Sequence, residues 1–261
     1  MIKEDVKFAD STVFEGMTSI RAIIRSIDSG VSDRKIREIW FDKTKIQKIG
    51  KNLSYLKAVS KNYGFDLVET TEEKINEITL GTSHGGLIAI TENRTIPLLF
   101  ENNHKIRDNG FYCMIQGIED PYNFGYSLRS LYACGCDGII LPERNWMTAA
   151  GVVARSSAGA SEMFEMYTAD ASDAARIFKD LGYRIVCADE STDNVLGKCE
   201  LKLPLLLIVG GEKRGISKAL IDNADLLVKI NYAREFRASL SAASATTMFA
   251  YEIMRQNQKN I

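Results

Sequence analysis

Hydrophobic and polar positions alternate along the first ninety residues with two periods, one helical and one extended. Apolar residues at positions 20, 23, 24 and 27 predict an amphipathic helix over 17–27 that ends at Ser29-Gly30. The same patterns predict strands over 36–41, 65–69 and 86–90, and helices over 45–63 and 72–78. Residues 1–16 show no clear period and are predicted to lead into the first helix. Such a run is long enough for a small independent α/β domain.

Buried-strand patterns recur in the rest of the chain, separated by helical patterns. Strands are predicted over 112–118, 137–141, 184–188, 205–209 and 226–230, and helices over 172–181 and 239–257. Alternating strands and helices of this kind predict a parallel sheet covered on both faces. The sequence therefore predicts a small α/β domain over 1–98, a polar linker over 99–108 and a second α/β domain over 109–261.

The strongest strand signal, at 205–209, runs into the glycine-rich charged stretch Gly210-Gly-Glu-Lys-Arg-Gly215. Open α/β sheets bind ligands at the carboxyl ends of their strands, so this stretch is predicted to form part of a site. Its spacing matches the frame of a phosphate-binding P-loop, but Ile216 stands where the required lysine would be. No G-x-G-x-x-G follows a strand either. A nucleotide triphosphatase and a dinucleotide-dependent oxidoreductase are both disfavoured.

Two further loops follow predicted strands. One combines an Asp-Pro turn with Asn123, Gly125 and Arg129, and Gly125 is predicted to open a helix. Arg129 stands among apolar residues, and a partly buried guanidinium needs a partner. An internal salt bridge and a fixed cation at the site explain this pattern equally well, and Glu212 is a natural partner. The other loop precedes the alanine-rich C-terminal helix.

Composition places the chain among globular proteins, with 45% hydrophobic and 26% charged residues. A polar start and the absence of any apolar run of membrane-spanning length predict a cytoplasmic protein with no membrane partner. Five cysteines, an odd number in mostly apolar surroundings, indicate reduced thiols. Cys134-Gly-Cys136 lacks the spacing of a zinc pair, and no metal site is expected. His84 precedes two glycines, which favours a tight turn over a substrate contact.

Charge is distributed unevenly, although the net charge is only −1. Eleven lysines and arginines between positions 21 and 61 stand against four acidic residues. A solvated helical face and a footprint for the phosphates of a nucleic acid explain this excess equally well. A mildly acidic chain with one basic segment suits a two-part protein whose N-terminal part contacts RNA.

Taken together and in order, the three loops resemble the motifs of the SpoU/TrmH family in the SPOUT superfamily, which comprises S-adenosylmethionine-dependent RNA ribose 2′-O-methyltransferases. The first motif, N-x-G-x-x-x-R, is met by Asn123, Gly125 and Arg129. The second, G-x-E-x-x-G-x-S, is met by Gly210, Glu212, Gly215 and Ser217. The third is met in part by Ile230, Ser239 and Leu240, and the stretch 156–160 is similar to a further family segment. The resemblance covers about 109–257.

This resemblance implies that the second domain is a parallel-sheet α/β knot, with its C-terminal segment threaded into a trefoil. It implies that the first domain is small, ribosomal-protein-like and RNA-binding, and that the protein is a homodimer with S-adenosylmethionine as cofactor. The implied reaction centre consists of Arg129, Asn123, Glu212 and Ser239. The implied cofactor contacts are Ala188, Gly210, Gly211, Gly215, Ile230, Leu240 and Ser241, with Gly210 leaving room for a bent cofactor.

The implied function is methylation of a ribose 2′-hydroxyl in RNA, with large-subunit ribosomal RNA as the expected substrate. Two alternatives stay open: the same chemistry on transfer RNA, which the N-terminal domain disfavours, and an RNA-binding protein that has lost catalysis. The second is motivated by the third motif, where Asn231, Tyr232 and Ser241 replace the family's Pro, Met and Asn. The proton acceptor is open between Glu212 and an RNA phosphate, because a guanidinium is hardly ever deprotonated.

Overall fold

The computed structural model describes residues 12–80, 84–118, 120–143, 145–211 and 215–258. The chain divides into two compact units. The first unit comprises Met1–Thr95 and Trp146–Met163, and the second comprises Ile96–Asn145 and Phe164–Ile261. The stretch Trp146–Met163, which lies inside the range predicted from sequence for the second domain, is grouped with the first unit.

A four-stranded mixed sheet forms the centre of the first unit, in the order β1-β4-β2-β3. Its strands are β1 (Val13–Glu15), β2 (Ile36–Asp42), β3 (Asp66–Thr70) and β4 (Leu87–Thr91). Its main helices are α2 (Gly16–Asp28), α3 (Ile46–Tyr63) and α4 (Glu72–Ile78). β2 and β3 are parallel, and β4 runs antiparallel to both β1 and β2. The helices and strands predicted from periodicity in this region are confirmed to within a few residues.

The prediction for residues 1–16 is wrong in its last part, because Val13–Glu15 forms strand β1. All three residues are buried, and they pair with positions 88–90 of β4. A strand of three residues is too short to show a period of two, so its pattern cannot be told from that of a leader. Pairing with a strand more than seventy residues away creates this element.

Small residues let the stretch 146–163 pack closely against β1 and α2. It folds into η3 (Trp146–Ala149), α7 (Ala150–Ser156) and η4 (Ala160–Met163). A Cβ on Gly151 would lie 2.0 Å from the carbonyl oxygen of Val13, and a Cβ on Gly159 would lie 2.5 Å from the Cβ of Ala22. Only glycine permits such close approaches, which explains why this stretch is grouped with the first unit.

Arg34 and Glu162 form a buried ion pair that ties the same stretch to the sheet. The Nε of Arg34 lies 2.9 Å from Oε2 of Glu162, and both side chains are at most 2% exposed. The guanidinium also donates to the carbonyl of Glu92 at 2.9 Å and lies 4.6 Å from the centroid of the Phe14 ring. Its charge is therefore compensated within the first unit and does not reach solvent.

His84 has a structural role in the turn before β4. Its Nδ1 accepts the backbone N–H of Gly86 at 3.0 Å, and its Nε2 lies 3.0 Å from Oδ1 of Asn76. Because Nδ1 is an acceptor, Nε2 carries the proton of the neutral ring and donates to Asn76. Burial lowers the pKa of His84, and the Lys45 cation adds to this effect. The tight-turn interpretation of His84 is confirmed.

Six parallel strands form the sheet of the second unit, in the order β10-β8-β9-β5-β6-β7. They are β5 (Phe111–Gln116), β6 (Gly138–Leu141), β7 (Glu165–Thr168), β8 (Arg184–Ala188), β9 (Leu205–Gly210) and β10 (Leu226–Val228). The helices of this unit are α5 (Leu99–Asn102), α6 (Pro121–Ala133), α8 (Ala171–Asp180), α9 (Lys218–Asn223) and α10 (Ala242–Asn257). The predicted α/β fold with a parallel sheet is confirmed.

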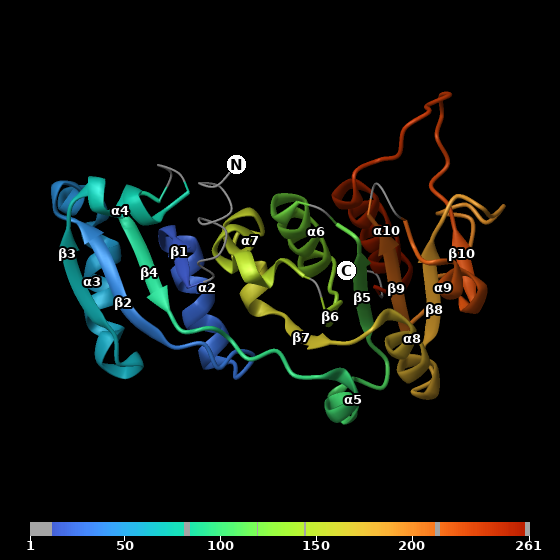
Figure 1. The fold of residues 1–261 in the computed structure, drawn as a ribbon, viewed down its shortest axis with the longest axis horizontal. Coiled ribbons are helices and arrows are strands. Elements are labelled where there is room, and N and C mark those ends of the chain that lie inside the picture. Colours follow the sequence, from blue (N-terminus) through green and yellow to red (C-terminus); the bar gives the residue numbers. More distant parts are fainter. Residues whose placement is uncertain (1–11, 81–83, 119, 144, 212–214, 259–261) are drawn as a thin grey trace. The chain divides into compact units, whose positions relative to one another are not determined.

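Helices cover both faces of this sheet (Figure 1). On one face, α8 and α9 pack onto inward-facing side chains that include Met114, Cys187 and Ile208. On the other, α6 and α10 pack against each other, and Oγ1 of Thr247 donates to Oγ of Ser130 at 2.7 Å. β5 and β9, at the centre, are buried along nearly their whole length, which accounts for their continuous apolar runs.

Two helix starts in the second unit differ from the predicted ones. α6 begins at Pro121, before Gly125, because the carboxylate of Asp120 accepts the backbone N–H groups of Tyr122 and Asn123 and caps the helix. α10 begins at Ala242, so Ser239 and Leu240 belong to the preceding loop.

The elements that were not predicted include β7 and α5. β7 is a four-residue edge strand with polar ends, and a strand of this kind carries little pattern. The short helix α5 lies in the predicted linker, and Leu99 within it is fully buried in the core of the second unit.

No helix among the described residues is long and apolar enough to cross a membrane. In the same residues, no group of three or more His, Cys, Asp and Glu side chains is arranged to hold a metal ion. All five cysteines are free thiols, and burial raises the pKa of Cys113, Cys136 and Cys187. These three thiols therefore stay protonated and unreactive at neutral pH.

Replacing Arg34 with methionine is expected to lower the free energy of unfolding of the first unit by about 3–5 kcal/mol, because Glu162 would be left buried without its partner. Urea unfolding followed by tryptophan fluorescence measures this, since both tryptophans, Trp40 and Trp146, lie in the first unit. Arg37→Met is the matched control, because the exposed Arg37–Glu92 pair contributes about 1 kcal/mol at most. Equal losses in the two variants would contradict the stabilising role of the buried pair.

Candidate functional site

Three loops meet at the carboxyl edge of the parallel sheet. β5 pairs with β9 in a register that places Gln116 opposite Gly210. Just beyond, a Cβ on Gly211 would lie 2.1 Å from the carbonyl oxygen of Gly117. The first and second predicted loops therefore touch through their backbones, at a point where only glycine fits. The third loop connects β10 to α10.

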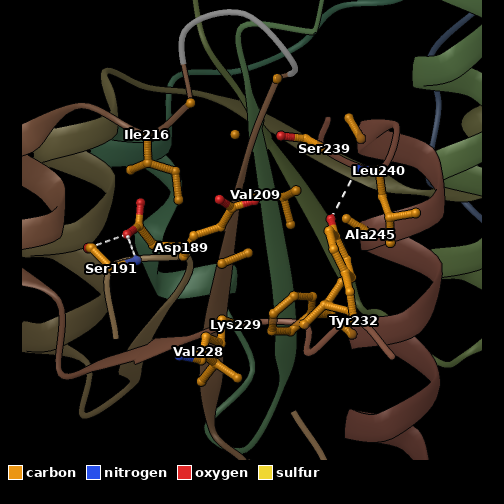
Figure 2. A pocket seen from close by; sticks show the side chains of 18 residues that line it. Asp189, Ser191, Val209, Ile216, Val228, Lys229, Tyr232, Ser239, Leu240 and Ala245 are labelled. Carbon is orange, nitrogen blue, oxygen red and sulfur yellow. Dashed lines mark hydrogen bonds between the residues drawn. The ribbon is translucent and has the colours of Figure 1, made fainter. Parts of the chain in front are cut away.

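A pocket of about 350 Å³ opens beside these loops. It is lined by the ends of β8, β9 and β10, by the loop between β10 and α10, and by the first turns of α10. Figure 2 shows Asp189 and Ser191 on one side of the pocket, and Tyr232 and Leu240 on the opposite side, with Val209 between them.

The pocket combines apolar walls with a half-buried carboxylate. Val209, Val228 and Phe249 are at most 2% exposed and form part of the walls. Asp189 follows β8, and its Oδ1 accepts both the backbone N–H of Ser191, at 2.8 Å, and the Ser191 hydroxyl. These bonds hold the carboxylate at the rim, where its other oxygen can accept from a ligand hydroxyl. The arrangement suits a ligand with a flat apolar part and polar groups at one end.

Tyr232 holds the third loop against the start of α10. Its hydroxyl accepts the backbone N–H of Leu240 at 3.2 Å, an interaction visible in Figure 2. Ser241 caps α10 instead of facing the pocket, because its Oγ accepts the backbone N–H of Ser244 at 3.2 Å. Two of the three residues that depart from the third motif thus have a structural use in this loop.

The structure brings seven predicted site residues together around this pocket. They are Ala188, Gly210, Gly211, Gly215, Ile230, Ser239 and Leu240. Asn123, Arg129 and Ser241 are not among the described residues that line it. Glu212 lies outside the described residues. The roles assigned to all these residues stay predictions.

The absence of a side chain at Gly210 has a structural reason in addition to the predicted one. A Cβ on Gly210 would lie 2.5 Å from the carbonyl carbon of Gly215 and 2.8 Å from the nitrogen of Ile216. It would therefore strike the returning chain of its own loop. That return is closed by the N–H of Gly215, which donates to the carbonyl of Gly211 at 3.0 Å. Gly210 therefore permits this close return of the chain, and its expected role in leaving room for a cofactor stays a prediction.

Arg129 is exposed on α6, which corrects the expectation that it is partly buried. The apolar neighbours that suggested burial lie on different faces of the helix. Leu128 is fully buried, whereas Tyr126 and Tyr132 are 49% and 43% exposed. Arg129 lies on the outer face, and its predicted partner Glu212 lies outside the described residues.

Sequence reasoning missed Asp189, Ser191 and Phe249 as pocket residues. An Asp-x-Ser stretch directly after the strand predicted at 184–188 stands at a carboxyl end, so the rule that singled out the other loops could have found the first two. Phe249 carries no such signal, because α10 reaches the pocket only through the folding of the last part of the chain.

Comparison with known proteins identifies one matching family. The model described as the SpoU rRNA Methylase family matches residues 110–251. The 23S rRNA (guanosine-2′-O-)-methyltransferase RlmB of Shewanella oneidensis is 25% identical over 261 residues, which cover 99% of this chain and 100% of that protein. The putative TrmH family tRNA/rRNA methyltransferase YacO of Bacillus subtilis is 25% identical over 235 residues, 88% of this chain and 92% of that protein.

Solved structures of similar fold cover nearly the whole chain. An AdoMet-bound rRNA methyltransferase from Sinorhizobium meliloti superposes with a TM-score of 0.76 at 23% identity, over 94% of this chain and 87% of that one. The SpoU methyltransferase AviRb from Streptomyces viridochromogenes, in complex with AdoMet, superposes with a TM-score of 0.75 at 20% identity, over 94% of this chain and 89% of that one. At these identities the likeness concerns the fold.

Proposed function

We propose, from the premise that this chain belongs to the SpoU rRNA methylase family, that it transfers a methyl group from S-adenosylmethionine to a ribose 2′-hydroxyl of large-subunit ribosomal RNA. The observation that carries the proposal is the pocket at the carboxyl edge of the sheet, around which seven predicted site residues gather. RlmB, whose name states the same reaction on 23S ribosomal RNA, matches this chain over its full length and supports the substrate.

The pocket fits the chemistry of S-adenosylmethionine. Its volume of about 350 Å³ lies in the range of small-molecule sites. Val209, Val228 and Phe249 suit a purine ring, and the carboxylate of Asp189 can accept a hydrogen bond from a ribose hydroxyl. Two AdoMet-bound proteins share the fold, which supports the same ligand here. When bound, the cofactor supplies a methyl group on a positively charged sulfur, a group that a nucleophilic oxygen can accept.

The chain's own residues have to align the ribose oxygen and stabilise it as it loses its proton. Ser239 lines the pocket and can donate to the incoming ribose. Arg129 supplies a permanent cation, which suits stabilisation of a developing negative charge and not proton removal. Glu212 and an RNA phosphate are the candidate proton acceptors.

A homodimer accounts for the position of Arg129 and Asn123 away from the pocket of their own chain. α6 and α10 present exposed Tyr126, Met248 and Tyr251, each 44–57% exposed, and such apolar exposure is typical of an interface. A second copy seated on this surface would cover these side chains and could bring its Arg129 to the pocket. The proposal therefore includes a homodimer. It also includes a trefoil knot within 109–261 and a cytoplasmic location.

RNA binding by the N-terminal domain, over 1–98, is supported by the surface of α2 and α3. Exposed lysines follow α3 at positions 48, 51, 57 and 61. The guanidinium of Arg21 lies 5.6 Å from the centroid of the half-exposed Tyr55 ring, an arrangement that can stack on a base. Lys45 contributes less, because its Nζ lies 2.6 Å from Oε1 of Glu72.

The proposed reaction is tested by incubating the protein with labelled S-adenosylmethionine and an unmodified 23S ribosomal RNA transcript, and then mapping any 2′-O-methylated nucleotide. We expect one or a few ribose sites to be labelled and calorimetry to detect cofactor binding. Label confined to transfer RNA would favour the alternative substrate. RNA binding without cofactor binding would favour a protein that has lost catalysis.

Arg129→Ala is expected to lower the rate of methyl transfer by about 10²–10³-fold, the loss typical of removing one group that stabilises charge in the transition state. Calorimetry should find the affinity for S-adenosylmethionine unchanged, because Arg129 does not line the pocket. Arg176→Ala, which removes another exposed arginine, from α8, should keep the parent rate. Methyl transfer by Arg129→Ala at the parent rate would refute the assigned role.

Tyr251→Glu is expected to convert the dimer to a monomer, because it places a charge in the apolar surface of α6 and α10. Sedimentation equilibrium measures this change. Leu181→Glu, at an exposed apolar position at the end of α8, serves as the control and should keep the dimer. Mixing Arg129→Ala with the pocket variant Leu240→Arg should restore part of the activity if each site uses both chains. A parent protein that sediments as a single chain would refute the dimer.

A further inference from the structure

The loop between β10 and α10 carries a second binding surface beside the pocket. It extends beyond the carboxyl edge of the sheet, as the orange-red excursion between these two elements in Figure 1. An open groove of about 490 Å³ runs along it, lined by residues 230–236 together with Leu240 and Met248. Ile230, Tyr232 and Leu240 line both the groove and the pocket. Any ligand in the groove therefore lies directly beside the ligand of the pocket.

Aromatic side chains give the groove a stacking surface. The ring centroids of Tyr232 and Phe236 lie 6.0 Å apart in an edge-to-face arrangement. Tyr232 is held by its hydrogen bond to the backbone of Leu240, so it provides a fixed support for Phe236. Phe236 itself is 57% exposed, which leaves most of the side chain available to a partner. Covering so exposed a phenylalanine with a flat partner is favourable, because it removes apolar surface from water.

Two exposed arginines accompany Phe236 on the same loop. Arg234 lines the groove, and Arg237 follows Phe236 directly. The Nε of Arg237 lies 3.8 Å from Oε1 of Glu235, but both side chains are more than 80% exposed, and such a pair contributes little. Both guanidinium groups are therefore available to bind an anion.

We infer that this loop binds an unpaired nucleotide of the RNA, with Phe236 stacking on its base and Arg234 and Arg237 meeting the flanking phosphates. The inference rests on the proposed function, because the ribose that is methylated has to lie beside the pocket, and its neighbour in the strand then falls in the groove. Proteins that read RNA do so mainly at unpaired bases stacked on aromatic or arginine side chains. The loop supplies both kinds of side chain at that position.

A flat apolar protein surface is the competing occupant, since a second copy of the chain could also cover Phe236. The two arginines favour RNA, because a desolvated protein interface would have to compensate both charges whereas the phosphates of a strand provide them with partners. Measuring the oligomeric state of the Phe236 variant distinguishes the two occupants.

The test compares Phe236→Ala with Phe100→Ala, which removes an equally exposed phenylalanine (62%) from α5 outside the groove. With the 23S ribosomal RNA transcript, Phe236→Ala should raise the KM for RNA on the order of tenfold, the effect of losing one base–aromatic stack. The Kd for S-adenosylmethionine and the sedimentation of the protein should match the parent. Phe236→Trp should restore the KM, because the indole ring also stacks. Phe100→Ala should resemble the parent in every measurement.

A second readout does not depend on catalysis. The same transcript carrying 4-thiouridine, irradiated with the full-length protein, should crosslink to residues 232–237, and Phe236→Ala should lose this crosslink. If the parent crosslinks there without transferring methyl groups, the proposed reaction fails and the RNA-binding loop stands. If the parent is active but Phe236→Ala equals it in KM and crosslinking, the loop inference alone is refuted. A dimer lost in Phe236→Ala would identify the second copy as the occupant and also refute it.

Discussion

Backbone contact between the first two loops is the constraint on which the rest of the site depends. Gly211 lies so close to Gly117 that any side chain would force the loops apart, and Gly210 is equally close to the return of its own loop. The parallel pairing of β5 with β9 brings both loops to the same edge. One side of the pocket is thus formed largely by backbone whose position follows from strand pairing. Such preorganisation suits a reaction that needs two reactants in line.

The third loop contributes side chains to the pocket. Tyr232 replaces the methionine that is usual in the family's third motif. Its hydroxyl accepts the backbone N–H of Leu240 and so holds Leu240 at the pocket wall. Ser241, in place of asparagine, caps α10. Both departures therefore support the loop in its place, and neither by itself argues for lost catalysis. Tyr232 also lines the groove beside the pocket, where the loop's own aromatic and basic residues lie.

The cationic side chains of the first unit fall into two groups. Some are paired within the unit and stabilise its fold, and others are exposed to solvent. Arg34 is buried against Glu162 and Phe14, and Lys45 is paired with Glu72, so neither charge belongs to an RNA footprint. The lysines along α3 remain exposed. The positive excess counted in the sequence is therefore part structural and part exposed, and both explanations offered for it concern the exposed part.

The sequence by itself determined the fold class, most helices and strands, and the three loops that lie at the carboxyl edge of the sheet. These properties are local, because a strand or helix repeats its burial pattern every few residues and a glycine-rich loop follows its own strand. Only the tertiary structure decided the existence of β1 and β7, the grouping of Trp146–Met163 with the first unit, the exposure of Arg129 and the contribution of Phe249 to the pocket. Each of these depends on contacts between residues far apart in the chain. Strand pairing and close backbone approach create such contacts, and neither leaves a period in the sequence.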